Sequence, residues 1–156
     1  MVRKRSKRKQ GFKTQSEEVP YYVLKSNGRG PKIVEKKSKF IATGFRVNSK
    51  DEAQSFISQI QTEFKKASHN SWAYQLILPN GNIFQDSNDD GEVSGTAGKP
   101  MLFILEKKNV VNTLILVTRF YGGINLGPAG LIRNYSGACK DLLERIGTEI
   151  FEHKSK

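Results

Sequence analysis

Hydrophobic residues recur along the chain with two different periods, and each period predicts a different secondary structure. Residues 21–25 and 39–47 are rich in aromatic and β-branched side chains, which favours β-strands. The glycines and proline within residues 27–31 favour a loop between these strands, and a tight turn is expected near Lys37 and Ser38. The early part of the chain is therefore expected to be mainly β-structure.

Further along, apolar residues recur at the three- and four-residue spacing of amphipathic helices. Ser49 followed by Glu52 forms a capping-box pattern, which predicts a helix over about residues 50–66. Pro100 suits the first turn of a short helix, because its missing N–H would be unpaired there in any case. An apolar stripe over about residues 129–146 predicts the last and longest helix.

Three more segments complete the expected sheet. Residues 71–78 and 83–85 flank a Pro-Asn-Gly-Asn turn and are typical of a β-hairpin. The continuous apolar run at residues 113–117 indicates a strand covered on both sides or central in its sheet, and a short final strand is expected at residues 148–151. This order of elements predicts an α+β fold, a two-layer sandwich with helices packed on one face of a mixed β-sheet.

Charge is concentrated at the N-terminus and separates an arm from the domain. The 156-residue chain has a net charge of +11, and seven basic residues precede the first acidic residue, which leaves +4 on the rest. Residues 1–16 cannot bury enough apolar surface to fold alone, so we expect a basic disordered arm before a single domain at residues 17–156. Neutralised phosphates release counterions, so such an arm favours a nucleic-acid partner, and the alternative is a solubilising or nuclear-import tail. The candidate RNA-binding residues of the arm are Arg3, Lys4, Arg5, Lys7, Arg8 and Lys9.

Composition excludes several other classes of protein. No stretch approaches the roughly 20 consecutive apolar residues of a membrane span, and the N-terminus lacks the apolar core of a secretory signal. The single cysteine, Cys139, cannot form an intramolecular disulfide, and with two histidines it provides no zinc-ligand cluster. We therefore expect a cytoplasmic protein with no membrane contact, cofactor or metal. A nuclear or mitochondrial location is the alternative that the basic arm leaves open.

Glycine-rich segments run into a helix at two places, residues 95–98 and 127–130. Each would present backbone N–H groups at the positive end of a helix, where phosphate groups bind. Three cations near these turns, Lys99, Arg119 and Arg133, are candidate phosphate- or RNA-binding residues. The alternative is that the arginines pair with acidic residues of the same region and hold the loops in place.

Familiar motifs for the acidic loop before the first glycine-rich turn each fail at a named position. An EF-hand calcium loop needs glutamate where Ala97 stands, and a Walker A loop needs glycine at Val93 and serine or threonine at Pro100. Acid–base catalysis by Asp89, Asp90 and Glu92 would need a pocket and a perturbed partner, and the sequence shows neither, so hydrogen bonding and capping of the glycine-rich loop is favoured for these three residues. No residue is assigned a catalytic role.

Two long blocks, DDGEVSGTAGKP at residues 89–100 and VTRFYGGINLGPAGLIRNYSGA at residues 117–138, closely resemble the signature blocks of the IMPACT/YigZ family. KKSKFIA at residues 36–42 and ASHNSWAY at residues 67–74 are similar to its earlier blocks. The signature residues present in this chain are Asp90, Gly91, Glu92, Ser94, Gly95, Thr96, Gly98, Thr118, Arg119, Tyr121, Gly122, Gly123, Gly127, Gly130, Arg133, Tyr135 and Ser136.

The resemblance implies an α+β domain similar to the fourth domain of elongation factor G. Bacterial members usually add a ferredoxin-like C-terminal domain. Eukaryotic IMPACT proteins carry an N-terminal RWD domain that binds the activator of a stress-responsive translation kinase. We expect neither domain in this chain, and without the RWD domain the kinase-regulating mechanism does not transfer. Val93 stands where the family usually has proline, and Asn125 stands where it often has lysine, which removes a cation from the second turn.

Three classes of function are compatible with these observations. We favour a non-enzymatic RNA- or ribosome-associated protein linked to translation or its regulation, with a translation-related protein as a further partner. The second is an enzyme or binding protein for a phosphorylated or nucleotide ligand that uses residues 90–98 and Arg119. The third is a protein-interaction module that exposes Phe120 and Tyr121, which burial of both aromatic rings would weaken. The oligomeric state does not follow from the sequence.

Overall fold

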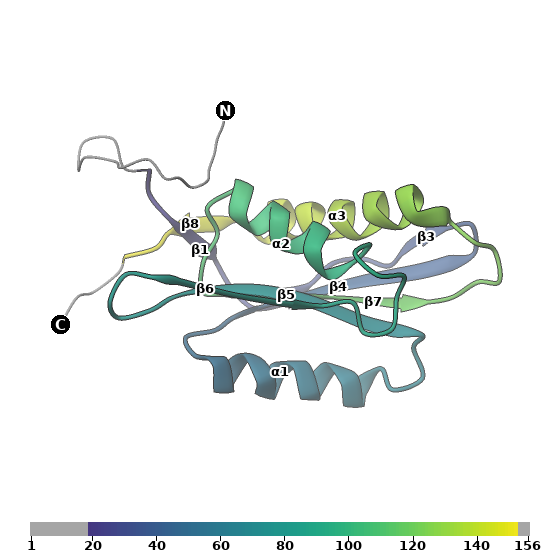
Figure 1. The fold of residues 1–156 in the computed structure, drawn as a ribbon, viewed down its shortest axis with the longest axis horizontal. Coiled ribbons are helices and arrows are strands. Elements are labelled where there is room, and N and C mark those ends of the chain that lie inside the picture. Colours follow the sequence, from purple (N-terminus) through teal and green to yellow (C-terminus); the bar gives the residue numbers. More distant parts are fainter. Residues whose placement is uncertain (1–18, 153–156) are drawn as a thin grey trace.

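The computed structural model describes residues 19–152, which form a central β-sheet with helices on both of its faces (Figure 1). The candidate residues of the basic arm lie outside the described residues. The helices are α1 (Lys50–Glu63), α2 (Gly98–Lys107) and α3 (Gly127–Ile146). The strands are β1 (Tyr22–Leu24), β2 (Gly28–Arg29), β3 (Ile33–Glu35), β4 (Ser38–Arg46), β5 (His69–Ile77), β6 (Ile83–Asn88), β7 (Thr113–Phe120) and β8 (Thr148–Ile150).

The main sheet has six strands in the order β2-β4-β7-β5-β6, with β3 also paired to β4. These strand pairs are all antiparallel, where the sequence predicted a mixed sheet. Within the described residues, parallel pairing is limited to one bridge between Tyr22 and Val110. The central strand β7 is buried along its whole length except at Phe120, as its continuous apolar sequence indicates.

Helices cover both faces of this sheet. α2 and α3 pack on one face, over a core that includes Ile115 and Val117 of β7. α1 packs on the other face, over a second core that includes Leu114 and Leu116 of the same strand. Successive side chains of a strand point to opposite faces, so a strand that is apolar at every position needs cover on both. The α+β class is confirmed, but the predicted placement of all helices on one face is wrong for α1.

The elements agree with the sequence pattern except where tertiary contacts set their ends. The capping box is present, because the Ser49 side chain accepts a hydrogen bond from the Glu52 N–H at 3.1 Å. The strands β2 and β3 were not predicted separately, and β2 falls inside the expected loop. It has two residues, Gly28 and Arg29, which pair with Gly44 and Thr43. A strand this short leaves no periodicity to detect.

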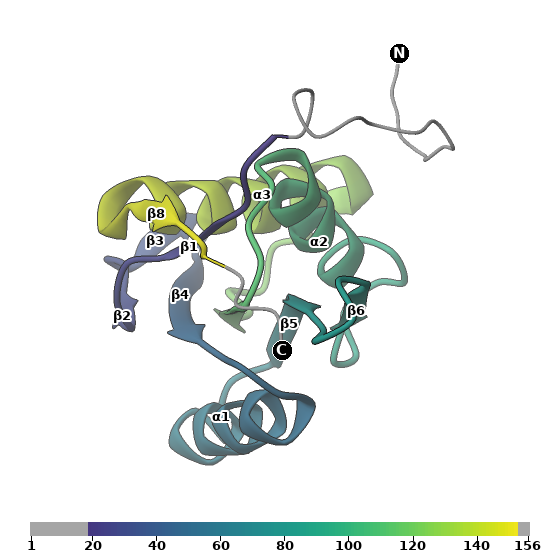
Figure 2. The same ribbon diagram turned by 90° about the vertical axis from the view of Figure 1, so that its left-hand side faces the viewer.

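A small second sheet joins the two ends of the described chain. β1 pairs with β8, as Figure 2 also shows, with Tyr22 opposite Ile150. In Figure 1 this small sheet lies at one end of the long axis, while the β3–β4 turn and the start of α3 lie at the other. The chain therefore enters the domain at the end opposite its glycine-rich signature loops.

Candidate functional site

Arg119 lies near the end of β7, where its side chain is buried at 4% exposure. Its Nη1 donates to both carboxylate oxygens of Glu92 at 3.1 and 3.0 Å, and its Nε and Nη2 donate to Ser38 Oγ at 3.3 and 3.1 Å. A guanidinium has five N–H donors, so these bonds leave little capacity for an added phosphate. The pairing alternative considered from the sequence is present here, with Glu92 as the partner.

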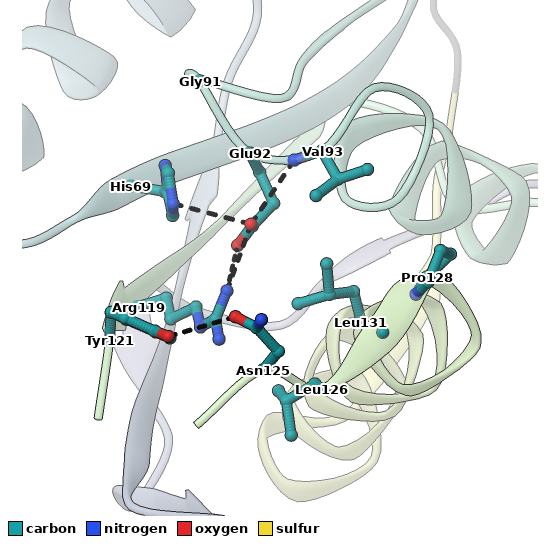
Figure 3. A pocket seen from close by; sticks show the side chains of 11 residues that line it. His69, Gly91, Glu92, Val93, Arg119, Tyr121, Asn125, Leu126, Pro128 and Leu131 are labelled. Atoms are coloured by element: carbon teal, nitrogen blue, oxygen red, sulfur yellow. Dashed lines mark hydrogen bonds and ion pairs between the residues drawn. The ribbon is translucent and has the colours of Figure 1, made fainter. Parts of the chain in front are cut away.

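Glu92 is the centre of this buried network. Besides the bonds from Arg119, its carboxylate accepts a hydrogen bond from the Tyr135 hydroxyl at 2.6 Å. Figure 3 shows His69 on the other side of Glu92, with His69 Nε2 3.5 Å from the carboxylate. Burial and the adjacent Glu92 carboxylate raise the pKa of Tyr135 well above its ordinary value, so its hydroxyl stays a donor. A buried charge is tolerated when it is paired and hydrogen-bonded. The network joins β5, β7, α3 and the loop before α2.

The acidic residues before Glu92 hold the first glycine-rich loop in place. The Asp89 carboxylate accepts hydrogen bonds from the N–H groups of Gly95, Ala97 and Gly98 at 2.8, 3.2 and 2.9 Å. α2 has no capping side chain at Ala97 itself, so Asp89 caps this helix from a distance. The Asp90 carboxylate is used in the same way and accepts the Asn70 N–H at 2.7 Å. Loop capping is what the structure shows for both.

A hollow of about 610 Å³ lies beside this network. His69, Glu92, Arg119 and Tyr121 line one side of it, and the start of α3 from Leu126 lines the other (Figure 3). No side chain caps the N-terminus of α3, so the first-turn N–H groups beside the hollow lack a side-chain cap, and Pro128 has no N–H. The space is therefore suited to a small anion or polar ligand. The one carboxylate that lines it, Glu92, is paired with Arg119.

Two signature glycines are required by close approaches of backbone. A Cβ on Gly122 would lie 2.1 Å from the carbonyl carbon of Lys37, and a Cβ on Gly98 would lie 2.8 Å from the backbone nitrogen of Asn88. Gly95, Gly123 and Gly127 instead have positive φ angles of 79°, 90° and 76°, which favour glycine. These residues therefore shape the loops through backbone conformation and close packing.

The three predicted cations of the domain are not brought together. Arg119 is inside the network, whereas Lys99 lines a different, shallow hollow with Ser136. Arg133 is exposed on α3, and neither Lys99 nor Arg133 has a hydrogen-bonding or ionic partner among residues 19–152. Lys99 and Arg133 are thus free to meet an anionic partner.

The remaining signature residues mostly contribute internal contacts. Thr118 donates to Asn70 Oδ1 at 2.7 Å, and Thr96 donates to the Val93 carbonyl at 2.5 Å. Gly91 has a φ of 81° and packs near His69, while Gly130 is buried in α3. Ser94 is exposed.

Sequence reasoning did not identify two members of the network, Ser38 and His69. Ser38 was expected only in a turn, yet its hydroxyl also accepts the Gly122 N–H at 3.2 Å. His69 is placed opposite Arg119 by the pairing of β5 with β7. Both lie in the earlier blocks that resemble the family, which was the available signal. Within residues 19–152, no group of acidic, histidine or cysteine side chains is arranged to hold a metal ion. No helix in that range combines the length and apolarity needed to cross a bilayer.

The fold and the site together give an antiparallel α+β domain whose first glycine-rich loop is held to β7 by a buried arginine–glutamate pair. The chain belongs to the family of the Impact N-terminal domain, which matches residues 36–143.

Relatives from bacteria and fungi share this region. The chain is 42% identical over 127 residues to the IMPACT family member YvyE of Bacillus subtilis (strain 168), covering 81% of this chain and 57% of that protein. It is 39% identical over 133 residues to the Protein IMPACT homolog of Schizosaccharomyces pombe (strain 972 / ATCC 24843), covering 80% of this chain and 47% of that protein. It is 35% identical over 114 residues to YigZ of Escherichia coli (strain K12), covering 73% and 56%. The chain thus spans about half the length of these relatives.

Two solved structures share the fold. The crystal structure of a hypothetical protein superimposes with a TM-score of 0.75 at 30% identity, covering 83% of this chain and 62% of that one. The two-domain translational regulator Yih1 superimposes with a TM-score of 0.54 at 24% identity, covering 89% of this chain and 54% of that one. At that identity, the second similarity concerns the fold alone.

Proposed function

We propose that this chain is a non-enzymatic RNA- or ribosome-associated protein linked to translation or its regulation. The observation that carries the proposal is that the buried arginine of the domain is paired with an acid, whereas some exposed basic residues are not paired within residues 19–152. The interior ion pair, Arg119 with Glu92, is neutralised within the fold, whereas Lys99 and Arg133 are exposed without partners among the described residues. Together with the net charge of +11, this leaves surface cations to meet phosphates.

We include a link to translation in this proposal because Yih1, which shares the fold of this chain, is a translational regulator. The hollow by itself does not favour catalysis. A general base must reach the proton that it removes, and the Glu92 carboxylate is already hydrogen-bonded to Arg119 and Tyr135. Translation-related RNA is therefore the partner that we propose, and the cytoplasm is the compartment.

Co-sedimentation of the full chain with ribosomes over a series of KCl concentrations tests this function. We expect binding that weakens steeply as salt rises. The comparison variant replaces Arg3, Lys4, Arg5, Lys7, Arg8 and Lys9 with glutamine, and we expect it to bind more weakly with a shallower salt dependence. Absence of ribosome and RNA binding at low salt would contradict the proposal.

A phosphorylated small molecule is the second candidate partner, because the hollow borders the uncapped N-terminus of α3. Thermal-shift measurements with nucleotides, sugar phosphates and Mg²⁺ address it directly. A saturable rise in melting temperature with one such ligand supports this candidate, and the absence of any rise rejects it.

A further inference from the structure

We propose that the end of the domain opposite β1 binds single-stranded RNA through five lysines, Lys36, Lys37, Lys39, Lys65 and Lys66, here called the lysine cluster. This inference rests on the proposed function and names the surface of the folded domain that would serve it. None of these residues was assigned a role from the sequence. The cluster is separate from the hollow described above, whose lining includes none of the five.

Backbone contacts bring the two segments of the lysine cluster, residues 36–39 and 65–66, to one end of the fold. Lys36 and Lys37 form the turn between β3 and β4, and this turn lies directly against Gly122. Lys39 is paired with Phe120, whose ring contacts that of Phe64 at the end of α1. The Ser68 N–H donates to the Arg119 carbonyl, and the Tyr121 N–H donates to Ser68 Oγ, at 2.9 Å each. Lys65 and Lys66 are therefore anchored between Phe64 and Ser68.

The lysine cluster is not neutralised by the domain itself. All five side chains are exposed, and none has a hydrogen-bonding or ionic partner within residues 19–152. In the adjoining segments Glu63 is paired with Arg29 and Glu92 with Arg119, and the Asp90 carboxylate is hydrogen-bonded to the Asn70 N–H. Glu35, in the same hairpin as three of the lysines, is half-buried. Five positive charges at this end therefore attract a polyanion.

The conformation of the β3–β4 turn is a second and independent indication. Glu35 pairs with Ser38, so Lys36 and Lys37 alone make the turn, and their φ angles are 47° and 69°. Two-residue turns with positive φ at both positions strongly favour Asn-Gly, because other side chains cost about 1–2 kcal/mol per residue there. Folding alone therefore disfavours lysine at both positions. Such a departure from local preference is typical of functional surfaces.

Tyr121 indicates RNA as the polyanion rather than an acidic protein segment. Its side chain is 49% exposed although it lies between the lysine cluster and the start of α3. The ring is fixed in place by its hydroxyl, which donates to Asn125 Oδ1 at 3.0 Å, and by the Arg119 guanidinium 5.2 Å from its centroid. A fixed, exposed aromatic ring beside lysines suits stacking of an unpaired base while the lysines meet its phosphates.

Lys36→Asn combined with Lys37→Gly tests the cluster, because this variant removes two charges while it improves the turn. We measure binding of a fluorescein-labelled single-stranded RNA by anisotropy across KCl concentrations, using the full chain. Each phosphate contact on a single strand contributes about 0.7 to the slope of log K against log salt, so the slope should become shallower by about 1.4. Between about 50 and 200 mM KCl, wild-type affinity should then fall about sevenfold more than that of the variant.

The control is Lys107→Gln combined with Lys140→Gln, which removes two exposed lysines outside the cluster and should leave the slope unchanged. Tyr121→Ala should weaken binding about tenfold without changing the slope, because it removes stacking and no charge. The melting temperature of the Asn-Gly variant should equal or exceed that of wild type, so a loss of binding cannot be assigned to unfolding.

Three results would overturn the inference. Wild-type protein that binds no RNA rejects both this surface and the proposed function. RNA binding with equal slopes in wild type and the Asn-Gly variant rejects the lysine cluster alone and leaves the arm as the contact. Labelled polyglutamate that binds the cluster more tightly than RNA does would identify an acidic protein partner instead.

Discussion

At the scale of single residues, Glu92 links the first signature loop to β7 and α3. It neutralises Arg119, accepts the Tyr135 hydroxyl and lies near His69, all at low exposure. Breaking a buried ion pair leaves an uncompensated charge, whereas breaking an exposed pair leaves a charge that water can solvate. The energetic importance of Glu92 therefore comes from its burial.

We predict that Glu92→Gln lowers the free energy of unfolding by about 3–5 kcal/mol, because it leaves the Arg119 charge buried without a counterion. Glu63→Gln is the matched control. It breaks the Arg29–Glu63 bridge, whose side chains are 36% and 43% exposed, and should cost about 1 kcal/mol or less. Urea denaturation of both variants measures the difference, and equal losses would contradict the assigned role of Glu92.

The Tyr135 hydroxyl gives a pH-dependent prediction. Burial raises its pKa above the ordinary value of 10.0 in the folded state, so above that pH the unfolded chain releases a proton that the folded chain retains. The contribution of Tyr135 to stability is therefore complete below pH 10.0 and is lost as pH rises further. Tyr135→Phe should cost about 2 kcal/mol near neutral pH.

The free energy of unfolding of wild type and of Tyr135→Phe, measured between about pH 8 and pH 11, tests this effect. The contribution of Tyr135 to stability should fall by about 1.4 kcal/mol per pH unit once Tyr135 ionises only in the unfolded state. The stability advantage of wild type over Tyr135→Phe should be constant at first and then shrink. A constant advantage throughout would mean that Tyr135 titrates alike in both states.

Sequence could supply the candidates for this network but not their pairing. Arg119 was identified as the cation at a strand end, and both phosphate contact and pairing with acids were considered. Whether Arg119 contacts a phosphate or pairs with an acid depends on how β5 and β7 align and on where the loop before α2 folds back. Local sequence does not show this, because Glu92 is 27 positions away from Arg119 in the chain. His69 and Ser38 belong to the same network through strand register alone.

At the scale of elements, Gly122 sets how closely the β3–β4 hairpin approaches the loop after β7. A Cβ there would lie 2.1 Å from one backbone atom of Lys37 and 2.2 Å from another, and backbone cannot move aside as a flexible side chain can. The hairpin turn and the glycine-rich loop are consequently a single packed unit.

We predict that Gly122→Ala destabilises the protein by about 1–3 kcal/mol or more, because the hairpin must move away. Gly137→Ala provides the control, since a Cβ at that position of α3 meets no atom within 4 Å and alanine favours the helix by about 0.5–1 kcal/mol. Thermal denaturation should therefore shift in opposite directions for the two variants. A neutral Gly122→Ala variant would show that the turn and loop are not packed as described.

Elements with strong local signals were predicted well. The capping box at Ser49, the hairpin and the long apolar stripe of α3 each depend on residues close in sequence. The side of the sheet that α1 covers was predicted wrongly, because an amphipathic pattern shows that a helix has a buried face and does not show which sheet face it meets. The continuous apolar run of β7 was the clue, since it requires cover on both faces.

At the scale of the whole molecule, the fold separates the lysine cluster from the point where the described chain begins. The chain enters the domain near β1, while the lysine cluster lies with the β3–β4 turn at the other end of the long axis (Figure 1). Two linked contacts on one strand bind more tightly than either alone when the strand spans both. The sequence indicated the basic arm, but the lysine cluster is assembled from two segments that are more than 20 residues apart and has no single sequence signature.

The salt dependence of RNA binding by the full chain tests this account most directly. With the six basic residues of the arm changed to glutamine, the protein should still bind single-stranded RNA, and log K should fall linearly with log KCl at a slope of about −3.5 for five lysine contacts. Wild type should show a steeper slope. Binding that is insensitive to salt, or that disappears completely in the arm variant, would contradict a phosphate-binding surface on the folded domain.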